Sequence, residues 1–113
     1  MTTNDFKMGP KEWGVAAEAY AHLREPLTLP YGIDTLAALR VEPGERSLDL
    51  ATGTGGVALA AARRGAEVVA VDWSPGMVNF LTARSTGEGI EGISVRVIDG
   101  QNLDFPTTHF DAA

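Results

Sequence analysis

The chain has 113 residues, of which 44% are hydrophobic and 21% charged, a composition typical of one soluble globular domain and not of a disordered or membrane-spanning segment. Its formal net charge of -6 disfavours nucleic acid and anionic membranes as partners, because both would repel it. The lack of cysteine and the presence of only two histidines predict no disulfide and no metal site. We therefore expect a small-molecule ligand and, without a signal-peptide core near the start, a cytoplasmic protein.

Residues 1–45 are predicted to form a helical segment ahead of the main fold. Apolar and aromatic residues recur at helical spacing over 11–24 and again over 33–41. Pro26 and Pro30 are expected to interrupt the helix between these two stretches. A turn at 42–45 then leads into the first strand.

From residue 46 onward the pattern alternates between strand and helix. Strands are predicted at 46–50, 67–71 and 93–98, and helices at 57–64 and from 75 to about 87. Gly65 marks the end of the first of these helices, and Ser74 followed by Pro75 marks the start of the second. The third strand alternates apolar and polar residues, as an edge strand does. This order predicts an α/β fold with a Rossmann-like parallel sheet, flanking helices and a ligand site at the carboxyl ends of the strands.

The most informative motif is the segment S-L-D-L-A-T-G-T-G-G at 47–56, where a strand runs into a glycine-rich turn. The glycines allow a tight turn and a close approach of the backbone to a ligand, and the next helix offers free N–H groups. Residues 53–58 also satisfy the G-x-G-x-x-A pattern of NAD sites. Asp49, however, would repel a pyrophosphate and attract an ammonium group. S-adenosylmethionine carries an ammonium and a sulfonium and no phosphate, so it is favoured over a dinucleotide.

Four segments, at 49–55, 69–77, 99–106 and 110–111, carry a family resemblance. In this order they resemble the first four motifs of a class I S-adenosylmethionine-dependent methyltransferase, in the small-molecule branch that includes the ubiquinone-biosynthesis-like enzymes. The resemblance covers roughly residues 13–113 and departs at Ala51, where the family usually has glycine. It implies the N-terminal, cofactor-binding half of a seven-stranded fold, with about three to four strands. Residues 46–113 would be this core, ending at the start of strand four.

The resemblance also implies roles for single residues. Asp49 and the glycine-loop backbone would meet the methionine half of the cofactor, and Asp72 would accept hydrogen bonds from the ribose hydroxyls. Asp99 would accept the adenine amino group. On the N-terminal helix Trp13 and Tyr20 have the spacing of core residues, and only Tyr20 is retained as a candidate. The predicted cofactor-binding residues are Tyr20, Asp49, Ala51, Gly53, Thr54, Gly55, Asp72, Trp73, Met77, Asp99, Gly100 and Gln101.

Methyl transfer from a sulfonium is an in-line displacement, which requires the nucleophile and the methyl group to be held together. No catalytic residue is therefore predicted, and the resemblance implies a small-molecule methyl acceptor held by segments after the fourth strand. An unpaired outer edge of the first strand is expected to favour a homodimer. Two alternatives stay open: a fragment of an NAD(P)-binding oxidoreductase, and a non-catalytic cofactor-binding or oligomerisation module.

Overall fold

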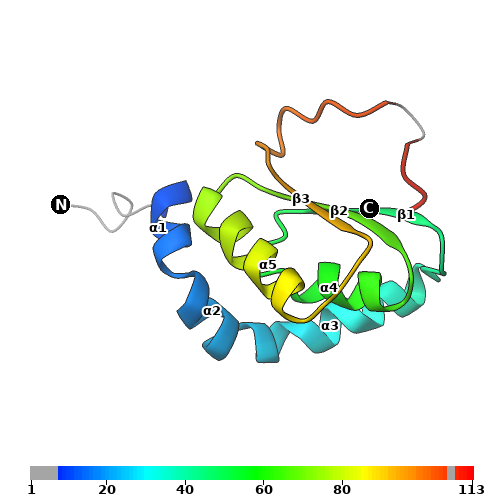
Figure 1. The fold of residues 1–113 in the computed structure, drawn as a ribbon, viewed down its shortest axis with the longest axis horizontal. Coiled ribbons are helices and arrows are strands. Elements are labelled where there is room, and N and C mark those ends of the chain that lie inside the picture. The colour runs from blue at the N-terminus through cyan, green and yellow to red at the C-terminus, as the bar shows by residue number, and fades with distance from the viewer. Residues whose placement is uncertain (1–7, 107–108) are drawn as a thin grey trace.

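The computed structural model describes residues 8–106 and 109–113 and has one parallel sheet with helices packed on it (Figure 1). The predicted α/β fold and the alternation of strand and helix are confirmed. The elements in chain order are α1 (Pro10–Val15), α2 (Ala17–Leu23), α3 (Glu25–Ala38), β1 (Arg46–Leu50), α4 (Gly56–Arg63), β2 (Glu67–Asp72), α5 (Pro75–Gly87) and β3 (Ile93–Val97).

The sheet has the strand order β1-β2-β3 with all strands parallel. Asp49 of β1 is paired with Ala70 of β2, two residues before Asp72. Because side chains alternate across a strand, Asp49 and Asp72 lie on the same face near the carboxyl ends of neighbouring strands. β3 is the outer strand of the described sheet, and its exposed Ser94 and Arg96, which alternate with the partly buried Ile93 and Val95, confirm the predicted edge strand with a partly wet face.

The outer edge of β1 is paired at residues 46–48. The prediction of an unpaired edge was therefore wrong for the first half of this strand. The Leu48 N–H donates to the carbonyl of Ala112 at 2.9 Å, and the Asp111 N–H donates to the carbonyl of Arg46 at 2.7 Å. Ser47 and Ala112 form a parallel bridge. The segment after β3 returns to the sheet (Figure 1), so that β1 lies between β2 and residues 111–112. Free backbone groups on a strand edge attract a further strand, and here the chain supplies it.

α4 and α5 cover the same face of the sheet (Figure 1). Leu59 of α4 and Leu81 of α5 are fully buried there, together with Ala58 and Ala70. Full burial of one leucine side chain contributes roughly 1.5–3 kcal/mol, and the small alanines let α4 lie close to the strands. This layer fixes the positions of the strand ends and of the loops that follow them.

The N-terminal helices form an outer layer, with α1 and α2 on α5 and α3 on α4. The predicted interruption was correct just before Pro26, since α2 ends at Leu23, and wrong at Pro30. Pro26 stands in the first turn of α3, where a backbone N–H has no helical partner, and Pro30 lies inside the same helix. A Cβ on Gly32 would lie 2.3 Å from a methyl group of Val57, so α3 packs closely against α4. We attribute the continuity of α3 through Pro30 to this packing. The helical segment breaks at position 24, just before Pro26, and also at position 16, where no break was predicted.

Within 8–106 and 109–113, no helix combines the length and apolar character that a membrane crossing requires. The same residues include no group of three or more histidine, cysteine or acidic side chains placed to hold a metal ion.

Candidate functional site

The loop at 51–55 joins β1 to α4 at the carboxyl end of the sheet. Gly55 has φ 86°, and a Cβ at this position would lie 2.1 Å from Cδ1 of the buried Leu81. Only glycine fits there without moving the core. Ala51 has φ 52°, which is uncommon for a residue with a side chain. The alanine that departs from the family pattern therefore adopts the backbone conformation that a glycine would adopt more easily.

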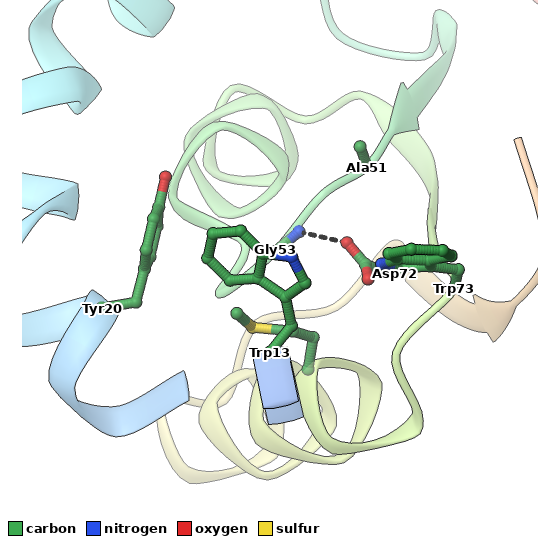
Figure 2. Close-up of a pocket in the computed structure, with 7 residues that line it drawn as sticks. Trp13, Tyr20, Ala51, Gly53, Asp72 and Trp73 are labelled. Carbon is green, nitrogen blue, oxygen red and sulfur yellow. Dashed lines mark hydrogen bonds between the residues drawn. The ribbon is translucent and has the colours of Figure 1, made fainter. Parts of the chain in front are cut away.

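Asp72 ties this loop to the tip of β2. Its carboxylate accepts a hydrogen bond from the Gly53 N–H at 3.0 Å and another from the Ser74 N–H at 2.9 Å. Figure 2 shows the first of these bonds. The residue is only 7% exposed, yet it lines a pocket. Two backbone donors do not exhaust the acceptor capacity of a carboxylate, so Asp72 can still accept hydrogen bonds from a ligand.

Asp49 is the second acid of the site. One of its carboxylate oxygens accepts the Thr52 hydroxyl at 2.8 Å. Burial raises the pKa of Asp49, the Thr52 hydrogen bond lowers it, and the negative charge of Asp72 raises it again, so that the pKa is above its usual value. Two neighbouring carboxylates favour a positively charged ligand group here and disfavour an anion.

A pocket of about 260 Å³ opens beside Asp72 (Figure 2). Tyr20 lies on one side of the view, and Asp72 with Trp73 lies on the other. The rings of Trp13 and Tyr20 meet edge to face with their centroids 6.1 Å apart. The pocket is lined by Trp13, Tyr20, Ala51, Gly53, Asp72, Trp73 and Met77. Six of these seven were predicted as cofactor-binding residues.

Trp13 is the pocket residue that the sequence analysis left out. Its spacing from Tyr20 is that of one helix face, which favoured packing in the core. The structure keeps the two rings together, but it places them in the pocket wall because α1 and α2 lie across α5 beside the loop. The same spacing would have indicated Trp13 as a pocket residue if Trp13 and Tyr20 had been assigned together to one ligand-facing side of the helical segment.

A second pocket, of about 230 Å³, lies on the side of Asp72 toward β3. It shares Ala51, Asp72 and Trp73 with the first pocket and adds Leu50, Ile98, Asp99, Gly100 and Gln101. Asp99 accepts the Gln101 N–H at 2.9 Å, which shapes the turn after β3. Asp72 and Trp73 thus stand between two adjoining pockets that together contain nine of the twelve predicted residues.

The other three predicted residues, Asp49, Thr54 and Gly55, lie outside both pockets and shape the loop. Thr54 is 1% exposed, and its hydroxyl donates to Oε1 of Glu25 at 2.8 Å. No sequence signal indicated Glu25, because an acid in the first turn of a helix is common and usually exposed.

Known methyltransferases are similar to this chain in sequence and in fold. A family model described as a methyltransferase domain matches residues 48–113. A demethylmenaquinone methyltransferase of Thermobifida fusca is 41% identical over 78 residues, which are 69% of this chain and 33% of that protein. The structure of a SAM-dependent methyltransferase from Geobacter sulfurreducens, in complex with S-adenosyl-L-homocysteine, has a TM-score of 0.54 and 33% identity over 62% of this chain and 29% of that one.

A SAM-dependent methyltransferase from Aquifex aeolicus has the same fold, with a TM-score of 0.69 and 19% identity over 88% of this chain and 52% of that one. The chain spans about a third of the length of the curated relatives it matches.

Proposed function

The chain belongs to the methyltransferase domain family, and on that premise we propose that it is the cofactor-binding part of an S-adenosylmethionine-dependent methyltransferase with a small-molecule acceptor. The observation that carries the proposal is the position of Asp72, a nearly buried carboxylate between two adjoining pockets at the carboxyl end of a parallel sheet. Ligands of open α/β sheets bind at this end.

In this proposal the two pockets hold the two ends of one ligand. The ribose hydroxyls would donate to Asp72, which is already oriented by Gly53 and Ser74. The adenine would lie toward Asp99, with the exposed ring of Trp73 beside it. The methionine end, with its ammonium and sulfonium, would lie toward Trp13 and Tyr20, where aromatic rings favour cations.

The NAD(P) alternative is disfavoured by the charges around the glycine loop. A pyrophosphate would sit at the N-terminus of α4, as anions do at helix N-termini. The carboxyl group of Glu25 already occupies that end of the helix, since a Cβ on Gly56 would lie 2.9 Å from it. Asp49 and Asp72 add two further negative charges nearby.

Bound S-adenosylmethionine would supply an electrophilic methyl group. The residues of this chain would orient the cofactor and shield it from water, because an in-line displacement depends mainly on alignment. Asp72 would fix the ribose, and the aromatic residues would cover the methionine end. No proton-transfer role is assigned to any residue of the two pockets.

Calorimetric titration with S-adenosylhomocysteine and with NADH tests the proposal. We expect the chain to bind the first and to ignore the second. Asp72→Ala should weaken binding about tenfold or more, because a hydrogen bond to a charged group contributes ~1.5–3 kcal/mol. Asp104→Asn, a charge change at an exposed position, is the matched control and should bind normally. Binding of NADH alone, or a folded Asp72→Ala chain with unchanged affinity, would refute the proposal.

We further propose a division of the chain, a cellular compartment and an oligomeric state. Residues 46–113 are the cofactor-binding core, and 1–45 are the N-terminal segment that contains α1, α2 and α3. The protein works in the cytoplasm. A homodimer forms through the part of the β1 edge that residues 111–112 leave uncovered, where the Leu50 side chain is exposed. A single monomer peak in size-exclusion chromatography at high protein concentration would contradict the dimer.

A further inference from the structure

Glu25, at the start of α3, connects three elements that are far apart in the sequence. Its Oε1 accepts the Thr54 hydroxyl at 2.8 Å and Nη1 of Arg84 at 2.7 Å. The same Nη1 donates to the backbone carbonyl of Thr54 at 3.2 Å. Glu25 is 8% exposed and Thr54 1%, so these bonds are largely shielded from water. We call these three residues the Glu25 cluster.

The Glu25 cluster also stabilises the start of α4. The cap position of this helix is Gly55, which has no side chain with which to satisfy the first N–H groups. The carboxyl group of Glu25 lies beside Gly56, where a negative charge is favourable at the helix N-terminus. A residue of α3 therefore provides what α4 cannot provide for itself.

The charges within the cluster compensate one another. Burial alone would raise the pKa of Glu25, but hydrogen bonds from Arg84 and Thr54 and the charge of Arg84 lower it below its usual value. The carboxylate is thus ionised at neutral pH and paired. The carboxylate is the sensitive member of this pair, because without its partners it would remain largely buried and uncompensated, whereas the Arg84 side chain is 25% exposed and its Nε also lies 3.8 Å from a carboxylate oxygen of Glu88.

We propose that Glu25 is a positioning residue that holds the glycine loop in its ligand-binding conformation and couples α3 to the cofactor site. Thr54 lies between Gly53, which lines the pocket, and Gly55, which is the N-cap of α4. Anchoring the Thr54 hydroxyl and carbonyl therefore fixes the turn on both sides. The ligand-binding part of this inference rests on the proposed function; the loop-ordering part does not.

The first measurement is the affinity for S-adenosylhomocysteine. Thr54→Val removes the hydroxyl at nearly constant volume, and Glu25→Gln removes the charge. Each is expected to weaken binding about tenfold, because a charge-assisted bond that orders the loop is lost. Thr54→Ser keeps the hydroxyl and should retain wild-type affinity. Glu42→Gln, which makes the same charge change at an exposed position outside the cluster, is the matched control and should bind normally.

The second measurement needs no ligand. Amide hydrogen exchange in the free chain reports the order of the loop through the Gly53 and Gly55 N–H groups, which bond to Asp72 and to the Thr52 carbonyl. In Thr54→Val and Glu25→Gln these two amides should exchange about tenfold faster, relative to the amides of β2, and in Thr54→Ser they should not. Unchanged relative exchange, or exchange that rises equally across the protein, would overturn the positioning role.

The two measurements separate the two proposals. If the wild-type chain fails to bind S-adenosylhomocysteine, the proposed function fails, and loop exchange still decides whether Glu25 orders the loop. If the wild type binds and the Thr54→Val chain binds equally well, the coupling of Glu25 to the cofactor site is wrong, and the proposed function stands.

Discussion

The glycine loop allows a direct test of how tightly the site is built into the core. Gly55 and Gly53 both have positive φ, 86° and 59°, so an alanine is strained at either position. Their surroundings differ. A Cβ on Gly55 would lie 2.1 Å from a methyl group of Leu81, whereas within the described residues no atom would lie within 4 Å of a Cβ on Gly53. Gly53→Ala is therefore a matched control for Gly55→Ala.

The expected losses follow from these two geometries. The left-handed conformation costs an alanine roughly 1–2 kcal/mol, which is the whole expected effect of Gly53→Ala. Gly55→Ala adds the displacement of Leu81 in a close-packed core, typically ~1–3 kcal/mol. The free energy of unfolding should thus fall by about 2–5 kcal/mol in Gly55→Ala. That loss is a large part of the ~5–15 kcal/mol of a typical domain.

Urea denaturation followed by circular dichroism measures both variants. Equal midpoint shifts for the two alanines, or a larger loss for Gly53→Ala, would show that Gly55 does not face the core as the structure places it. The order should reverse for ligand binding. Gly53 lines the pocket, so among folded molecules Gly53→Ala should reduce the affinity for S-adenosylhomocysteine more than Gly55→Ala does.

Three further predictions concern the loop and its charges. Ala51→Gly should raise the free energy of unfolding by up to about 1 kcal/mol, seen as a higher urea midpoint, because relief of the positive φ exceeds the added entropy of the unfolded chain. Asp49→Asn should be more stable than wild type at neutral pH and weaker in binding S-adenosylhomocysteine. Its stability advantage should vanish as pH falls through the raised folded pKa of Asp49, because the wild-type carboxyl is then neutral too. Above pH 4.5, the usual pKa of a glutamate side chain, the wild type should be more stable than Glu25→Gln. This advantage should be lost as pH falls through the lowered pKa of Glu25 in the folded protein, because the carboxylate is then protonated. Urea midpoints across pH that move in the opposite sense would contradict either pH prediction.

Features that depend on neighbours along the chain could be predicted from the amino-acid sequence. Alternating apolar runs indicated three strands, and Ser74 before Pro75 marked the start of α5, where its hydroxyl accepts the Met77 N–H at 3.3 Å. The glycines of the loop and the acids at the ends of β1 and β2 follow from the same local rules. Burial periodicity and backbone sterics act over a few residues, so a single sequence contains them.

Features that depend on contacts between residues far apart in the chain could not be predicted in this way and are visible only in the folded protein. Pro30 stays inside a helix where packing on α4 supports it, and Trp13 faces a pocket although its spacing is that of a core residue. Thr54 was predicted to meet the cofactor as part of the glycine-loop backbone, and the structure adds that its hydroxyl binds Glu25, a residue no motif indicated. Which side chains meet across such distances depends on how whole helices pack on the sheet, and that packing is a property of the complete fold.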